Sequence, residues 1–180
     1  ILQKKEKVLR KNAQEIKILE IKKPKMKKIL AEMSAALKSQ DDGVALAAPQ
    51  IGYSLQIFIV SGKIFSPNFT RSREEQRLLN ENNITEKIEK KEKVKDLVFI
   101  NPKISKLSRK HEWMPEGCLS VRPLYGMTDR SLKATVTAYD ENGKKFTRGA
   151  SGLLAQIFQH ETDHLKGILF IDHAKDIKAE

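Results

Sequence analysis

Two histidines four residues apart, with a glutamate beside the first, are the residues whose types and spacing most clearly predict chemistry. They lie in the run Gln159-His160-Glu161-Thr162-Asp163-His164. Residues four apart share one face of a helix, so both imidazoles can reach a single metal ion. Glu161 then lies beside the ion, where a carboxylate can accept a proton from water and pass it to a leaving group. The motif predicts metal-assisted hydrolysis, and the alternative is a pair of hydrogen-bonded core histidines.

The third ligand of such a site is expected upstream of the helix. Phe170 occupies the position where the longer motif H-E-x-x-H-x-x-G-x-x-H has its third histidine. Cys118, the one cysteine of the chain, lies in Glu116-Gly117-Cys118-Leu119-Ser120. A thiolate with two imidazoles leaves one coordination position open, which makes Cys118 the best candidate. His111 and His173 are the alternatives, and both are more typical of surface histidines.

A third segment, Gly43-Val44-Ala45-Leu46-Ala47-Ala48-Pro49-Gln50-Ile51-Gly52, combines small residues with one amide. Small side chains let an extended ligand approach the backbone, and an amide N–H can stabilise an oxyanion. In chain order, the three segments resemble peptide deformylase, whose motifs are G-x-G-L-A-A-x-Q, E-G-C-L-S and Q-H-E-x-D-H-L-x-G. The resemblance covers most of the chain. Ala45 departs from the resemblance, because it stands where the first motif of the family has its second glycine. It adds a methyl group where the substrate backbone would pass.

The resemblance implies that the protein removes the N-formyl group from the initiator N-formylmethionine of nascent polypeptides and releases formate. It implies one divalent metal ion bound by Cys118, His160 and His164. Fe²⁺ is the family's usual ion, and the same ligand types also accept Zn²⁺, Ni²⁺ or Co²⁺. Glu161 would transfer the proton. The Gln50 amide and the backbone N–H of Leu119 would stabilise the oxyanion.

A substrate pocket is expected beside the ion. Leu153 and Ile157 share the helical face of the two histidines, so they are expected to form walls for the methionine side chain, although Leu153 is equally compatible with plain core. The peptide backbone is expected to lie as an added strand flanked by Val44, Ala45 and Gly117. Tyr125 and Arg130 are expected at the rim, unless Arg130 pairs with Asp42.

The elements that position these residues follow from the apolar pattern. Gly152 and Gly167 bracket a buried helix of about four turns. Apolar residues at three- and four-residue steps predict a second helix over 24–38, with the segment 43–52 following it as a loop. Strands are expected at 56–60, 97–100, 103–111, and 132–139 paired with 144–148. No βαβ alternation is present, so the fold class is α+β, with antiparallel β-sheets packed around a central C-terminal metal-binding helix.

Length and composition predict one domain over 1–180, with a polar insertion at about 61–95. The chain has 180 residues, of which 39% are hydrophobic and 32% charged, as is ordinary for a globular domain. No apolar run approaches the length of a membrane span, about 18 residues. One cysteine fits a reducing compartment. We therefore expect no membrane association and a bacterial-type cytoplasmic location, with an organellar location left open because a leader could have been removed.

The net charge of +11 predicts attraction to polyanions. For an enzyme of nascent chains the relevant polyanion is the ribosome. The lysines form no nucleic-acid motif, so no specific DNA binding is expected. Two alternative functions remain. One is a catalytically weak deformylase-like protein that acts as a basic ribosome- or RNA-binding module. The other is a metallopeptidase that cuts internal peptide bonds, against which the E-G-C-L-S segment argues.

Overall fold

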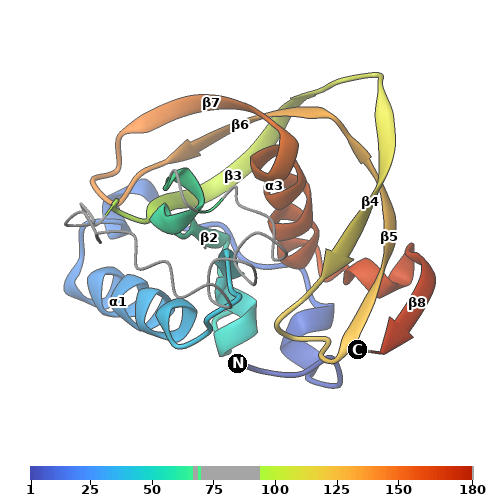
Figure 1. Cartoon of the computed structure of the whole chain (residues 1–180). Coiled ribbons are helices and arrows are strands. Elements are labelled where there is room, and N and C mark those ends of the chain that lie inside the picture. The colour runs from blue at the N-terminus through green and yellow to red at the C-terminus, as the bar shows by residue number, and fades with distance from the viewer. Residues whose placement is uncertain (67–68, 70–93, 180) are drawn as a thin grey trace, which may run out of the picture.

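The computed structural model describes residues 1–66, 69 and 94–179, and most of the polar insertion expected at 61–95 lies outside them. Two α-helices and eight strands form the described architecture (Figure 1). The helices are α1 (Pro24–Lys38) and α3 (Gly152–Leu165). The strands are β1 (Ala45–Ala47), β2 (Ile57–Val60), β3 (Leu97–Leu107), β4 (His111–Gly117), β5 (Leu124–Ser131), β6 (Lys133–Tyr139), β7 (Lys145–Ser151) and β8 (Lys175–Ala179).

The strands form two antiparallel sheets. One has the order β1-β2-β3-β6-β7 and the other the order β4-β5-β8. Figure 1 shows α3 between the five-stranded sheet and the strands β4 and β5. This arrangement confirms the α+β class with antiparallel sheets packed around the C-terminal helix. Within the described residues, no helix is both long enough and apolar enough to cross a membrane.

The strand β2 explains how one sheet packs against both helices. All four of its residues are buried. Successive side chains point to opposite faces of the sheet, and both faces are covered at this strand. Phe58 and Val60 pack in the cluster that contains α3, whereas Ile57 and Ile59 pack in the cluster that contains α1. The sheet therefore lies between the two helices and fixes the position of α3.

Two local predictions were wrong. The segment 43–52 is not simply a loop, because Ala45–Ala47 forms β1 and Ala48–Ile51 a 3₁₀ turn. The strands predicted separately at 97–100 and 103–111 form one strand, β3, which continues through Asn101 and Pro102 and ends at Leu107. Asn101 has φ +50° at a register shift, a conformation that asparagine tolerates. The Asn101 side chain accepts a hydrogen bond from the backbone N–H of Ile16 at 2.9 Å and donates one to the C=O of Ile16 at 2.7 Å.

The sheet of β4, β5 and β8 was not predicted from the sequence. β4 coincides only at His111 with a predicted strand, and β5 and β8 were not predicted. The register of β4 and β5 pairs Gly117 with Tyr125 and Glu112 with Arg130. This hairpin brings the cysteine motif back toward α3, so it completes the site that the motifs predict.

Candidate active site

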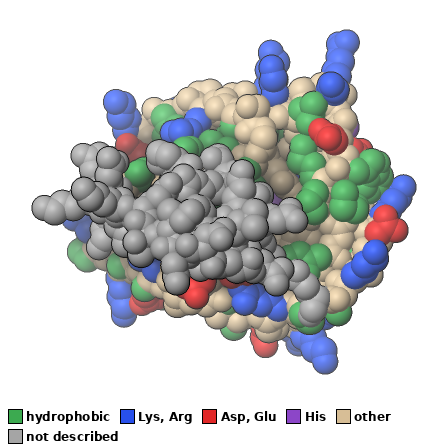
Figure 2. All heavy atoms as spheres, viewed as in Figure 1, with side chains coloured by type: hydrophobic (Ala, Val, Ile, Leu, Met, Phe, Trp, Pro, Cys, Tyr) green, Lys and Arg blue, Asp and Glu red, His purple; other side chains and the backbone are tan. Residues whose placement is uncertain are grey.

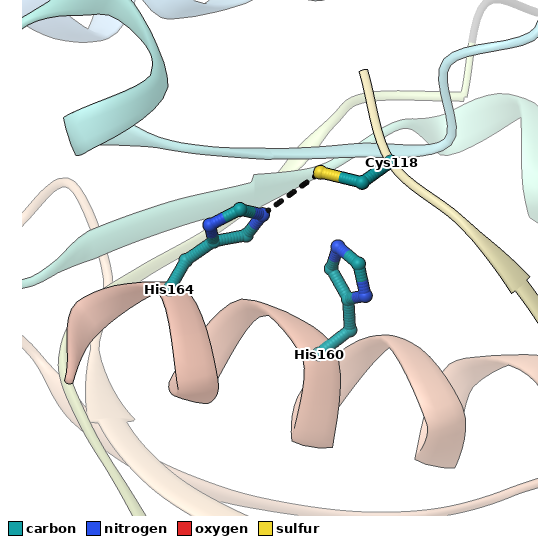
Figure 3. Close-up of side chains that lie close together, drawn as sticks. All are labelled: Cys118, His160 and His164. Atoms are coloured by element: carbon teal, nitrogen blue, oxygen red, sulfur yellow. Dashed lines mark hydrogen bonds between the residues drawn. The ribbon is translucent and has the colours of Figure 1, made fainter. Parts of the chain in front are cut away.

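The helix α3 presents the two histidines of the motif on one side. Figure 3 shows His160 and His164 projecting from the same side of α3 toward Cys118. His164 is 1% exposed, and Glu161, the next residue after His160, is 4% exposed. The apolar residues Ala155 and Phe158 bury the other faces of the helix against the five-stranded sheet. Packing therefore holds the polar face of the helix toward β4.

Cys118 follows directly after the end of β4 and meets the two histidines there. Its Sγ lies 3.2 Å from Nε2 of His164, and the ligand atoms of Cys118, His160 and His164 all lie within 4.8 Å of one another. Gly117, directly before Cys118, lets the backbone pass close to the Tyr125 ring, because a Cβ at that position would lie 2.5 Å from that ring.

The chemistry of this donor set fits a divalent ion. One sulfur and two ring nitrogens form the set found in zinc and related sites that keep a fourth position open. A ligand histidine must be neutral. Burial, followed by the neighbouring His160, lowers the pKa of His164 well below its usual range. For His160, burial acts in the same direction, but contacts with Cys118 and Glu116 outweigh it and raise the pKa well above its usual range. An ion that binds here would therefore displace a proton from the His160 ring.

Glu116 is a buried carboxylate that orients His160. It hydrogen-bonds to Nδ1 of that ring, which leaves Nε2 for the ligand cluster. Arg130 donates to both oxygens of Glu116 at 3.0 and 2.8 Å, and Thr128 donates at 2.5 Å. Such second contacts fix the tautomer and direction of a metal-binding histidine. Sequence reasoning assigned Glu116 no role, although its place in E-G-C-L-S was a usable signal.

The two roles predicted for Arg130 were both wrong. Arg130 is 6% exposed, so it does not lie at a rim, and it does not pair with Asp42. It binds Glu116 and also donates to Asp163 of α3 at 2.6 Å. Asp42 instead accepts a hydrogen bond from Arg122 at 2.6 Å, at the mouth of the pocket. The attraction of these two carboxylates offsets the desolvation cost of burying the Arg130 guanidinium.

Glu161 lies in the site without a full set of partners. Burial raises its pKa to about 7, while His160 acts to lower it and Glu116 to raise it. Among the described residues, Oε2 of Glu161 and Nδ1 of His164 are the buried side-chain atoms without a hydrogen-bond partner. A carboxylate whose pKa lies near neutral pH can both accept and return a proton.

Gln50 is held with its amide directed at the sulfur. Its Oε1 accepts from the backbone N–H of Ala47 at 2.8 Å, so its Nε2 must face the other way. That nitrogen donates to Oγ of Ser120 at 3.1 Å and lies 3.6 Å from Sγ of Cys118. Ser120, which is fully buried, is another residue that sequence reasoning assigned no role. The result is an amide N–H beside the ligand cluster.

A pocket of about 240 Å³ opens over these groups. Leu153 is 41% exposed and Ile157 4% exposed, so Leu153 is not plain core. Hydrophobic side chains also gather over β4 and β5 on the face seen in Figure 2. Trp113 of β4 and Tyr125 of β5 are both exposed. The predicted site residues that line the pocket are Val44, Ala45, Gln50, Gly117, Cys118, Leu119, Tyr125, Leu153, Ile157, His160 and Glu161. Sequence reasoning did not identify the lining residues Gly43, Pro115, Glu116, Leu124, Gln156 and Arg122, and it used Asp42 only as a partner for Arg130.

The alternative histidine ligands lie outside the cluster. Nε2 of His111 lies 3.1 Å from Oγ of Ser131, and its Nδ1 lies 3.4 Å from Asp129. His173 lies 3.7 Å from Asp163. In the part of the chain that the structure describes, the grouped metal-binding side chains are Cys118, His160 and His164.

Known proteins are similar to this chain in sequence and in fold. The family model described as polypeptide deformylase matches residues 1–180. The chloroplastic peptide deformylase 1A of Solanum lycopersicum is 35% identical over 169 residues, which cover 92% of this chain and 55% of that protein. Peptide deformylase 2 of Clostridium acetobutylicum is 33% identical over 166 residues, covering 92% of this chain and 87% of that protein.

The structures agree as well. The class I type b peptide deformylase of Acinetobacter baumannii, solved with Met-Ala-Ser bound, is 25% identical and superposes with a TM-score of 0.77 over 96% of each chain. This chain therefore spans about half the length of the tomato relative and nearly all of the Acinetobacter chain. Sequence and fold lead to one assignment. The chain belongs to the polypeptide deformylase family.

Proposed function

We propose that this protein is a metal-dependent hydrolase that removes the N-formyl group from the initiator N-formylmethionine of nascent polypeptides and releases formate. The observation that carries the proposal is the meeting of Cys118, His160 and His164 beside the buried Glu161, at the base of an open pocket. The family supports it, since deformylases are metal-dependent hydrolases. The Met-Ala-Ser peptide of the Acinetobacter structure is a product-like ligand for this reaction.

The ligand cluster would hold one divalent ion through Sγ of Cys118 and a ring nitrogen of each histidine. When bound, such an ion acts as a Lewis acid that polarises a carbonyl and lowers the pKa of bound water to about 7. We propose Fe²⁺ as the native ion, with Zn²⁺, Ni²⁺ or Co²⁺ as ions that the same donors accept. Thiolate ligation together with an oxidisable ion predicts activity that is sensitive to air.

Glu161 performs the proton transfer in this proposal. Its free oxygen accepts a proton from the attacking water as the new C–O bond forms at the formyl carbon. It returns that proton to the methionine nitrogen as the C–N bond breaks, so formic acid and a free amine leave, and the acid then ionises to formate. A pKa of about 7 suits both directions of transfer.

The developing oxyanion meets two N–H donors. Nε2 of Gln50 already points to this region, where it hydrogen-bonds to Ser120, and Leu119 lines the same pocket. We assign the second donor to the backbone N–H of Leu119. Loss of one such donor typically costs about 3 kcal/mol of transition-state stabilisation.

The apolar part of the pocket receives the methionine side chain. Leu153 and Ile157 of α3 form its helical wall, one turn apart. Val44, Ala45 and Gly117 flank the peptide backbone, which lies as an added strand between β1 and the end of β4. Tyr125, which is 38% exposed, forms the rim.

The partners of the reaction are formyl-Met nascent peptides, and we propose the ribosome as a further partner through the basic surface. The net charge of +11 supports this attraction. On the face seen in Figure 2, however, Lys and Arg side chains are spread around the outline and not gathered in one patch. A bacterial-type cytoplasmic location fits this role. The comparisons do not support the alternative of a catalytically weak binding module.

The experiment is formate release from formyl-Met-Ala by protein purified without air, with metal content measured on the same sample. We expect turnover that follows metal content and stops with a chelator. Acetyl-Met-Ala and a peptide blocked at both ends serve as controls, since a metallopeptidase would cut the blocked peptide instead. Background formate release from fully metal-loaded protein would overturn the proposal.

A further inference from the structure

Ala45 occupies a position from which its methyl group faces α3. It begins β1, where it pairs with Val60 of β2. Successive side chains of a strand alternate between faces, and its neighbour Leu46 packs in the cluster that contains α1. Ala45 packs in the other cluster, with Ile157 and Phe158 of α3. The methyl group therefore lies between the sheet and the helix, on the side away from α1.

The same residue reaches the pocket. Ala45 and Ile157 both line it, and they are 6% and 4% exposed. These small exposed fractions mean that each side chain is core on most of its surface and pocket wall on the rest. The apolar wall of the pocket is thus formed from two elements, with Ile157 on the helix side and Ala45 on the strand side.

We infer that the Ala45 methyl group sets how large a first side chain the pocket accepts, which makes Ala45 a specificity-determining residue. The inference rests on the proposed deformylase function and on the shared place of Ala45 and Ile157 in one buried cluster and one pocket wall. The backbone of Ala45 flanks the peptide, while its side chain limits the room for the methionine side chain. The methyl is consequently a selective feature and does not obstruct the peptide backbone.

The size of the expected effect follows from the behaviour of apolar pockets. One methylene more or less in such a pocket changes the specificity ratio by roughly 10- to 200-fold. Ala45→Gly removes one methyl from the wall, and the pocket should then accept a side chain that is one methylene longer. Close packing in the surrounding core keeps the rest of the wall in place.

The experiment compares kcat/KM for two formyl dipeptides. Formyl-norleucyl-Ala has a side chain as long as that of methionine, and formyl-2-aminoheptanoyl-Ala has one methylene more. We expect Ala45→Gly to shift the ratio of the two by about tenfold toward the longer side chain. Ala45→Val should shift the ratio in the opposite direction. If the glycine variant folds poorly, the valine variant tests the inference.

Ala138→Gly is the matched control. Ala138 lies in β6, is 1% exposed and packs in the same cluster, but it is not a pocket residue. It should leave the ratio unchanged. A ratio within about twofold of the wild type in both Ala45 variants would overturn the inference. If the wild type releases no formate from either peptide, the proposed function fails. The role of Ala45 is then decided by the affinities for the two unformylated dipeptides, whose ratio should shift in the Ala45 variants in the same directions.

Discussion

The helix α3 meets the two sheets through different chemistry. Toward the five-stranded sheet it presents Phe158, whose ring centroid lies 5.2 Å from Phe99 and 6.2 Å from Phe58. Toward β4 and β5 it presents His160 and Asp163, which meet Glu116 and Arg130 through hydrogen bonds and ion pairs. One interface is apolar and the other is ionic, although both are buried.

The difference separates stability from positioning. Apolar burial is non-directional and stabilises the fold in proportion to its area. Buried ion pairs add little net stability, because desolvation offsets their attraction, but they fix geometry. The apolar contact therefore holds α3 in the fold, whereas the ionic contact sets the direction of the His160 ring. Changes on the two sides of the helix should produce different kinds of loss.

The largest expected effect is at Glu161, which belongs to neither interface. Glu161→Gln keeps the size of the side chain and removes the proton acceptor. Because general acid–base catalysis contributes roughly 10²- to 10⁴-fold, formate release should fall by about 10³-fold. Metal content per chain should stay at the wild-type value. Turnover near the wild-type rate would assign the proton transfer to another group.

A change on the apolar side should affect stability alone. Phe158→Ala removes a buried ring from the aromatic cluster and should lower the free energy of unfolding by about 3–5 kcal/mol. Denaturant titration measures this loss. The metal affinity of the folded fraction should change little, since Phe158 packs in the aromatic cluster and is not one of the ligand residues. A large loss of metal affinity in the folded protein would show that the two interfaces are coupled.

The raised pKa of Glu161 predicts a pH dependence in the metal-free protein. The pKa of Glu161 is about 7 in the folded state and 4.5 ordinarily. Between pH 4.5 and about 7 the folded state therefore keeps a proton on Glu161 that the unfolded state has lost. Stability should therefore fall as pH rises from 4.5 to about 7. Glutamine cannot ionise, so Glu161→Gln should gain up to about 3 kcal/mol over the wild type above pH 7. Unfolding titrations of both proteins across this range measure the difference, and a constant difference would contradict the burial of the charge.

The smallest expected effect tests the ionic interface, through the contact of Glu116 with His160. Glu116→Gln keeps an oxygen near His160 but removes the charge that orients the ring, and metal affinity should fall by about 10- to 100-fold. Asp42→Asn is the matched control, because Asp42 forms an ion pair with Arg122 that is about half exposed. Such a pair contributes about 0–1 kcal/mol, and neither of its residues belongs to the ligand cluster. Equal metal affinity in both variants would remove the positioning role of Glu116.

The sequence predicted the elements with strong local signals. The helix α3 has its glycine before the histidines, apolar spacing and the H-E-x-x-H motif, and α1 has Pro24 at its start. The pair of β6 and β7 follows from alternation around Gly143. The choice of Cys118 over His111 and His173 came from residue type and from the resemblance, and the geometry brings Cys118 to the helix.

The features that sequence reasoning missed depend on contacts between distant segments. β1 has the sequence Ala-Leu-Ala, which carries no strand signal, and it becomes a strand by pairing with β2. Arg130 has no local pattern that identifies Glu116 and Asp163 as its partners, which lie 14 and 33 residues away in the chain. Its burial follows from the register of β4 and β5, a property of the assembled sheet.

The most direct measurement of the central claim is the absorption spectrum of the Co²⁺-loaded protein. If Cys118, His160 and His164 bind the ion, the spectrum should contain a thiolate-to-cobalt charge-transfer band. Cys118→Ser should lose this band together with formate release. A band that persists in Cys118→Ser, or full formate release without it, would contradict the account.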